Sequence, residues 1–222
     1  LGFLWTGRDY ERAGSFFREA VRLAQQLEDP TLHAHSLNRL GNWLVNTGQV
    51  AEGLEAHQHA LDVFQRQQDR AGMAETFARL SMALSWTGNI VEGAQQRRRA
   101  IALFRLLGDK KSLISTLPSA GLITCPALAE TVFVVVREVE QCERDAIEAA
   151  ELARQIDWPA GEAYAELCRG VVLASFGQFG RSLAHVHKGL QMAMEIDHQQ
   201  WTVGAYCHFG RIYVLMHESA LA

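Results

Sequence analysis

Residues 29–60 are DPTLHAHSLNRLGNWLVNTGQVAEGLEAHQHA, and residues 69–100 are DRAGMAETFARLSMALSWTGNIVEGAQQRRRA. The second stretch repeats the first: each opens with an aspartate, has a Thr-Gly pair near its middle and ends with an alanine. Similarity within a chain at a period of about 20 to 50 residues indicates an array of stacked supersecondary units. The two stretches therefore predict a repeat protein.

The same landmarks continue along the rest of the chain. Aspartates recur at Asp29, Asp69, Asp109, Asp157 and Asp197, and small residues recur at Gly41, Ser81, Gly121, Gly170 and Gly210. Within each row the intervals are equal except for the third, which is longer and indicates one insertion in the fourth repeat. We predict a single domain over 1–222 with repeats at 1–28 (partial), 29–68, 69–108, 109–156 (irregular), 157–196 and 197–222 (partial). Since both ends divide a repeat, the chain is expected to be a fragment of a larger protein.

Each repeat is expected to be a pair of helices. Asp29 followed by Pro30 is typical of a helix start, because the carboxylate accepts hydrogen bonds from free N–H groups and proline suits the first helical position. The other four aspartates of the row are predicted to cap in the same way. The first helix of the second repeat has leucines at the i, i+3, i+7 spacing of an amphipathic helix, at Leu37, Leu40 and Leu44. Gly48 is predicted to end this helix, since glycine tolerates the left-handed backbone found there.

These residues resemble the tetratricopeptide repeat, whose signature is W-x-x-L-G-x-x-Y followed by a turn glycine and small residues on the second helix. The segment Leu37-Asn38-Arg39-Leu40-Gly41-Asn42-Trp43-Leu44 matches the first part, with leucines at the Trp and Tyr positions, and Gly48, Gly53 and Ala60 continue the spacing. The repeats are longer than the usual length of about 34 residues. In this they are similar to kinesin light chains and to the sensor domains of large bacterial regulatory ATPases. The resemblance implies an all-α fold, a right-handed superhelix of stacked antiparallel helix hairpins.

The composition argues against several classes of protein. Hydrophobic residues make up 48% of the chain and charged residues 21%, as in folded globular domains. A net charge of −4 argues against a protein that coats nucleic acid. No apolar run approaches the roughly 20 residues of a membrane helix. The four cysteines lack C-x-x-C spacing and are expected to be core residues in a reducing, cytoplasmic compartment.

Patterns typical of catalysis or metal binding are missing from the sequence. Pairs of histidines occur at i, i+2, which places the two rings on nearly opposite faces of a helix; they are His33/His35, His57/His59 and His185/His187. Neither an H-E-x-x-H motif nor a Cys/His quartet occurs. The sequence also lacks a P-loop, a dinucleotide fingerprint and a nucleophile elbow. We therefore expect no metal, no cofactor and no enzymatic activity.

The first helix of each repeat, called helix A, carries the candidate binding residues. In tetratricopeptide arrays these helices line a concave groove, and the resemblance carries this role by register onto this chain. The implied groove residues are His35, Asn38, Asn42 and Asn46 in the second repeat, Glu75, Arg79, Met82 and Trp86 in the third, Tyr164, Cys168 and Val171 in the fifth, and His208 and Arg211 in the sixth. Aromatic, arginine and asparagine side chains suit an extended peptide, because they offer stacking area and hydrogen bonds. Alternatively, Trp86 packs against the next helix A.

The irregular fourth repeat contains a second candidate site. Its apolar residues Val132, Phe133, Val135 and Val136 either pack in the core or form a docking or dimerisation patch. Our leading hypothesis is a non-catalytic module that binds a protein or peptide segment, as the sensor or scaffold part of a multidomain regulator. The alternatives are structural self-association through the fourth repeat, giving a homo-oligomer, and small-molecule sensing inside the superhelix.

Overall fold

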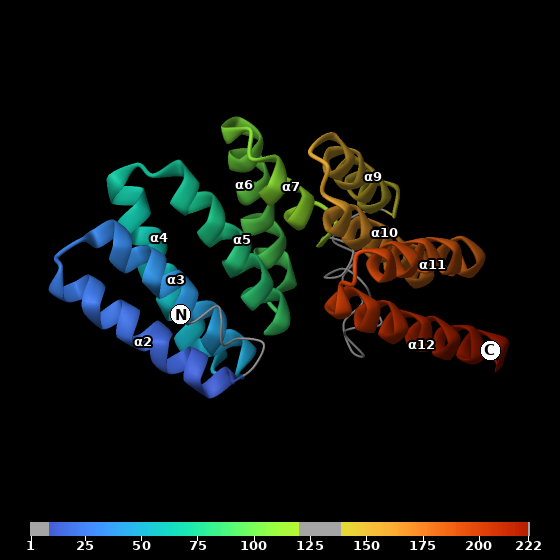
Figure 1. Cartoon of the computed structure of the whole chain (residues 1–222), viewed down its shortest axis with the longest axis horizontal. Helices are drawn as coiled ribbons and strands as arrows, with labels where there is room; N and C mark the ends of the chain where they lie inside the picture. Colours follow the sequence, from blue (N-terminus) through green and yellow to red (C-terminus); the bar gives the residue numbers. More distant parts are fainter. Residues whose placement is uncertain (1–8, 120–138, 222) are drawn as a thin grey trace. The chain divides into compact units, whose positions relative to one another are not determined.

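The computed structural model describes residues 9–119 and 139–221, and every regular element in these ranges is a helix (Figure 1). The helices are α2 (Tyr10–Gln26), α3 (Pro30–Asn46), α4 (Val50–Gln67), α5 (Arg70–Trp86), α6 (Ile90–Leu107), α7 (Lys110–Thr116), α9 (Val139–Gln155), α10 (Pro159–Ser175), α11 (Phe179–Glu195) and α12 (Gln199–Leu221). The predicted all-α class is confirmed. Within the described ranges, no helix combines the length and apolar character needed to cross a membrane.

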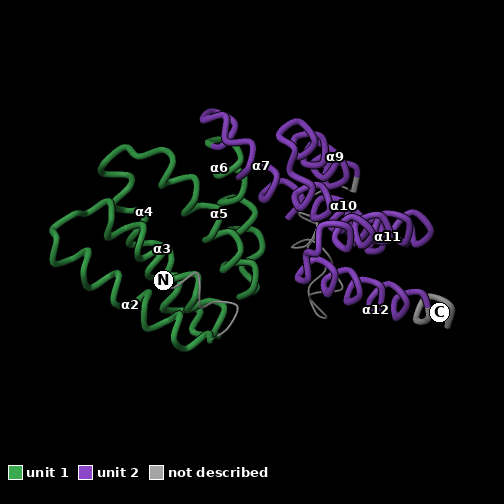
Figure 2. The backbone as a smooth tube through the Cα atoms, in the orientation of Figure 1, with its two compact units in different colours: residues 1–103 green, residues 104–222 purple. Residues whose placement is uncertain are grey.

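The chain divides into two compact units, residues 1–103 (unit 1) and 104–222 (unit 2), shown in Figure 2. In unit 1, α3 and α4 form a hairpin, with α2 packed on α3 and α5 packed on α4. In unit 2, α10 and α11 form a hairpin, while α9 packs on α10 and α12 packs on α11. The boundary falls within α6. The single domain expected from the sequence stays a prediction.

Aspartate carboxylates cap four of the described helices. Asp9, Asp29 and Asp109 each accept one hydrogen bond from a backbone N–H three residues on, over 2.9 to 3.0 Å. Asp69 accepts two, from the N–H groups of Ala71 and Gly72 at 3.0 Å. These bonds satisfy backbone donors that have no partner inside the helix. The sequence prediction for Asp29, Asp69 and Asp109 is confirmed.

The same prediction is wrong for Asp157 and Asp197. Both have φ of 51°, in the left-handed region, and each lies two residues before the first residue of the following helix. Trp158 stands at the cap of α10 and makes no side-chain cap bond, while the Nδ1 atom of His198 accepts from the N–H of Trp201 at 3.3 Å at the start of α12. Aspartate is one of the few non-glycine residues that enters the left-handed region readily. The interval from Gly121 to Gly170, rather than the shorter one from Asp109 to Asp157, therefore gives the helix register.

Small residues bring the two helices of a hairpin close together. A Cβ added to Gly41 on α3 would lie 3.0 Å from the carbonyl oxygen of Gly53 on α4, and one added to Gly53 would lie 2.8 Å from the carbonyl oxygen of Gly41. On α10, a Cβ at Gly170 would lie 3.0 Å from the carbonyl oxygen of Ser182 on α11. Glycine is needed here because the facing backbone occupies the space of a side chain.

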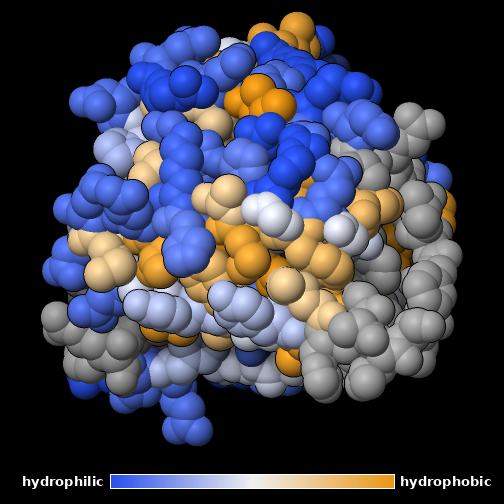
Figure 3. Space-filling view, turned by 90° about the vertical axis from the view of Figure 1, so that its right-hand side faces the viewer, coloured by the Kyte–Doolittle hydropathy of each residue, from blue (hydrophilic) through white to orange (hydrophobic). Residues whose placement is uncertain are grey.

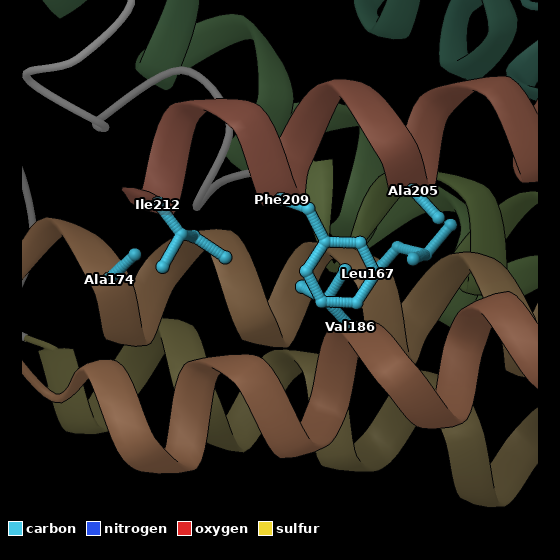
Figure 4. Close-up of a cluster of buried hydrophobic side chains, with 6 residues drawn as sticks. All are labelled: Leu167, Ala174, Val186, Ala205, Phe209 and Ile212. Carbon is cyan, nitrogen blue, oxygen red and sulfur yellow. The ribbon is translucent and has the colours of Figure 1, made fainter. Parts of the chain in front are cut away.

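Buried apolar side chains hold the helices of unit 2 together. One cluster draws on α10, α11 and α12, and Figure 4 shows Phe209 projecting from α12 toward Leu167 and Val186. The six buried members are Leu167, Ala174, Val186, Ala205, Phe209 and Ile212. In unit 1, a comparable cluster joins α3 and α4 around Leu37, Ala60 and Phe64.

Candidate functional site

Two neighbouring A helices of unit 1 present equivalent stripes of side chains. The residues lie at i, i+4, i+7 and i+11, so those of one helix share a face. They are His35, Arg39, Asn42 and Asn46 on α3, and at the equivalent positions of the next repeat Glu75, Arg79, Met82 and Trp86 on α5. We call these eight residues the unit 1 stripe. Seven of them were proposed from the sequence; Arg39 was not.

Glu75 gathers the charged end of the unit 1 stripe. Its Oε1 atom accepts a hydrogen bond from Nη2 of Arg79 at 2.6 Å and lies 3.4 Å from Nη2 of Arg39. Nδ1 of His35 lies 3.8 Å from Oε2 of the same carboxylate. Burial by itself would raise the pKa of Glu75, but the nearby Arg79 and Arg39 guanidinium groups outweigh it and hold this pKa below the ordinary value. The cluster therefore joins α3 to α5 through a carboxylate that is ionised at neutral pH.

The other end of the stripe is apolar and open to solvent. Trp86 is 57% exposed and Met82 45% exposed, whereas most tryptophan side chains are largely buried. Within the described residues, Nε of Arg79 is buried and has no hydrogen-bond partner. The exposed indole and thioether offer apolar area to a ligand.

Asn38, which the sequence placed in the groove, lies in the core instead. Its amide nitrogen donates to Oγ1 of Thr76 on α5 at 2.7 Å, and its carbonyl oxygen lies 3.0 Å from Nδ1 of His57 on α4. All three side chains are buried. Asn38 therefore links three helices and cannot contact a ligand. The exposed residue is Arg39, and the available signal was that it occupies the position of Arg79 in the next repeat.

His57 is neutral in this core network. Burial, together with the positive charge of Arg79, lowers the pKa of His57 from the ordinary 6.5 to about 3. Because the amide nitrogen of Asn38 is used by Thr76, the Asn38 oxygen faces His57 and Nδ1 of the ring carries the donated proton. The network satisfies each of its polar groups without a net charge.

The equivalent positions in unit 2 are mostly closed to a ligand. Cys168 and Val171 are buried, so the expectation that they line a groove is wrong in this conformation. Burial raises the pKa of the Cys168 thiol to about 12, which leaves it unreactive. Tyr164 is half-buried and stacks on Trp201 with ring centroids 4.9 Å apart. His208 and Arg211 are half-buried, and burial together with Arg211 lowers the pKa of His208 to about 4.

A buried carboxylate in unit 2 was not expected from the sequence. Glu166 on α10 accepts hydrogen bonds from Nδ1 of His185 and from Nζ of Lys188 on α11, each at 2.7 Å. Burial alone would raise the pKa of Glu166, but these two donors lower it to about 2. The equivalent position is occupied by Phe77 in the third repeat and by Leu37 in the second. Because Leu37 and Phe77 are buried apolar residues, the repeat register marks this position as part of the core. The two donors to Glu166 come from α11 and could not be read from the register.

The remaining expected site falls outside the described residues. Val132, Phe133, Val135 and Val136 belong to the range 120–138, so the choice between core and patch stays a prediction. In the ranges that the structure describes, no three His, Cys, Asp or Glu side chains come together as a set of metal ligands. The unit 1 stripe is therefore the best-defined candidate for binding.

Comparison with known proteins supports the fold. The crystal structure of BtubC (BKLC) from P. vanneervenii matches with a TM-score of 0.68 and 18% sequence identity, over 89% of this chain and 79% of that one. No protein-family model and no curated protein matches the chain. At this identity the likeness bears on architecture alone. The chain has a TPR-like helical repeat fold.

Proposed function

We propose that this chain is a non-catalytic module that binds a protein or peptide segment along the unit 1 stripe. The observation that carries the proposal is the exposed pair Met82 and Trp86, which shares one face of α5 with the ion pair of Glu75 and Arg79, while Arg39 of α3 lies 3.4 Å from the same carboxylate. Exposed tryptophan and arginine are the residue types that dominate the energy of protein interfaces. A TPR-like repeat array also serves as a scaffold that presents extended surface.

The chemistry of the stripe indicates the kind of segment that fits. Two arginines face one carboxylate, so the charged end carries an excess of positive charge and suits an acidic side chain. The apolar end suits a large apolar side chain that covers the indole of Trp86. Asn42 and Asn46, at the equivalent positions of α3, can hydrogen-bond to an extended main chain. The ligand is thus an extended segment with an acidic residue followed by a bulky apolar one. In a longer cytoplasmic protein, such a module would act as the sensor or scaffold of a regulator.

A displayed library of random peptides tests the proposal. Peptides selected on the wild-type chain should be enriched in acidic residues next to bulky apolar ones. Their affinity, measured by fluorescence anisotropy, should fall about tenfold or more for Trp86→Ala and for Arg39→Ala, because each removes an exposed anchor. Trp86 is 57% exposed, the half-buried Arg39 side chain is 40% exposed, and neither belongs to the buried core, so circular dichroism should show folded variants.

The matched control is Val91→Ala, which removes an equally exposed apolar side chain from α6. This control should bind the selected peptides like wild type. Selected peptides that bind both stripe variants as tightly as wild type would show that the binding site lies elsewhere, and failure to select any peptide would remove the support for a peptide-binding function.

A further inference from the structure

Two histidines from different helices of unit 1 meet across the hairpin of α3 and α4. His33 lies near the start of α3, and His59 lies in the middle of α4. Their ring centroids are 5.6 Å apart and the ring planes are at 90° to each other. His33 is half-buried, and its Nε2 atom is buried and has no hydrogen-bond partner within the described residues. The sequence places His33 beside His35 and His57 beside His59, whereas the fold brings His33 and His59 together.

The same two positions are in contact in the fifth repeat, where they hold an ion pair. The residues equivalent to His33 and His59 are Glu162 on α10 and Lys188 on α11. Nζ of Lys188 lies 3.7 Å from Oε1 of Glu162. The hairpin geometry therefore brings the ends of these two side chains together in both units. In unit 1 two bases stand where the fifth repeat has an acid and a base, so neither histidine can neutralise a charge on the other.

We propose that His33 and His59 together bind one divalent transition-metal ion of the Zn²⁺ type between α3 and α4. Imidazole nitrogen is a preferred ligand of Zn²⁺, Cu²⁺ and Ni²⁺. A zinc–nitrogen distance of about 2.0 to 2.1 Å and a tetrahedral angle place the centroids of two ring ligands roughly 5 Å apart. The observed separation of 5.6 Å is close to this value, and the exposed His59 ring is free to turn a nitrogen toward His33. The bound ion ties the start of α3 to α4.

The surroundings of the pair decide how tightly it holds the ion. Burial, with a contribution from the neighbouring His59, lowers the pKa of His33, so its ring is neutral and has a lone pair to donate at neutral pH. Within the ranges that the structure describes, His, Cys, Asp and Glu do not gather in threes, so water completes the coordination. Structural zinc sites have four protein ligands and this one has two. We therefore expect about half their binding free energy, which gives a dissociation constant on the order of 10 µM.

Isothermal titration calorimetry at pH 7, with Zn²⁺ alone as the probe, tests the site. The wild type should bind one ion with the stated dissociation constant. His59→Gln and His33→Gln should each bind at least about thirtyfold more weakly, because only one ring ligand is left. His59 is exposed, so its replacement leaves the buried core of unit 1 intact.

Unit 2 supplies the matched control. On the side of the molecule where α12 ends, hydrophilic residues surround a band of hydrophobic ones (Figure 3), and α11 of the same unit carries the exposed His187. The His187 ring contacts Phe209, with centroids 4.5 Å apart, and a phenyl ring offers no lone pair to a metal. His187→Gln should therefore bind Zn²⁺ like wild type. A wild type that binds no Zn²⁺, or a His59→Gln variant that binds it as tightly as wild type, overturns the proposal.

The histidine ring signals in proton NMR test whether one ion is shared. In the wild type, Zn²⁺ should shift the ring signals of His33 and His59 together, with the same titration midpoint. In His59→Gln, the same concentration of Zn²⁺ should leave the His33 signals in place, because a single ring binds much more weakly. A His33 signal that shifts equally in the wild type and in His59→Gln contradicts a shared ion, even where calorimetry finds one ion per chain.

Discussion

Replacing His57 with glutamine should remove an acid-sensitive part of the free energy of unfolding of unit 1. The His57 ring is buried and donates from Nδ1 to the carbonyl oxygen of Asn38 at 3.0 Å. Burial and the nearby Arg79 lower its pKa from 6.5 to about 3. Glutamine can still donate to Asn38, but it does not titrate.

The sign follows from which state binds the proton. As the pH falls below about 6.5, the histidine of the unfolded chain takes up a proton, while His57 in the folded chain stays neutral down to about pH 3. The contribution of His57 to the free energy of unfolding is therefore fully present above the unfolded pKa of 6.5. It declines as the pH falls toward the folded pKa of about 3. One pKa unit corresponds to about 1.4 kcal/mol, so His57 accounts for a loss of about 2 kcal/mol between pH 7 and pH 5.

Urea unfolding at pH 7, 6 and 5 measures this loss. Tryptophan fluorescence reports on unit 1 in a background with Trp158→Phe and Trp201→Phe, since both of these residues belong to unit 2. Between pH 7 and pH 5, His57→Gln should lose about 2 kcal/mol less than its parent. Ala51→Gln is the control on the same helix, at an exposed position that carries no titratable group, and it should keep the parent's pH dependence. If His57→Gln loses as much as its parent, His57 is protonated in the fold and the reasoning fails.

Three further predictions concern a cap, a close contact and the buried carboxylate of unit 2. In urea unfolding, Asp69→Ala should lower the free energy of unfolding by about 1 kcal/mol, because two N–H groups lose their acceptor. Asp157→Gly should leave it unchanged, since glycine accepts a φ of 51° without strain. An equal loss for both variants would contradict the corrected register. Gly72→Ala should lower the melting temperature in calorimetry, because its Cβ would lie 2.3 Å from a phenylalanine ring; Gly204→Ala, in open space, should raise it or leave it unchanged. Glu166→Gln should destabilise unit 2 by about 2 kcal/mol at pH 7, because the buried carboxylate that accepts from His185 and from the half-exposed Lys188 is lost. Urea unfolding followed through Trp158 and Trp201 measures this, and an unchanged free energy of unfolding would contradict a stabilising role of the carboxylate.

Local sequence predicted the helices and their hairpins well. The repeat period, the leucines at Leu37 and Leu44 and the turn glycine Gly48 are all visible in a single sequence, because helix patterns act within one or two turns. The registers of α10 and α12 were missed by one residue, because aspartate suits both a helix cap and the left-handed residue before it. Gly41 and Gly170, by contrast, stand where the backbones of two helices come into contact, so their places in the repeat cannot shift by a residue.

The candidate site was predicted less completely than the fold. The sequence assigned Glu75, Arg79, Met82 and Trp86 to one stripe, and the structure places all four along one face of α5. It assigned Asn38 in place of Arg39, although a shift of one residue rotates a side chain by about 100° around the helix. Asparagine and arginine are both polar, so composition does not distinguish a buried link from an exposed contact.

The sequence by itself determined that the chain is all-α, that its helices alternate in hairpins and that small residues lie where those helices meet. Only the tertiary structure decided that Asn38, His57 and Glu166 are buried and that the rings of His33 and His59 meet. Helix formation and close packing depend on spacing within the chain, which a sequence displays. Burial, and with it each pKa and each accessible surface, depends on side chains from other helices that a single sequence does not place.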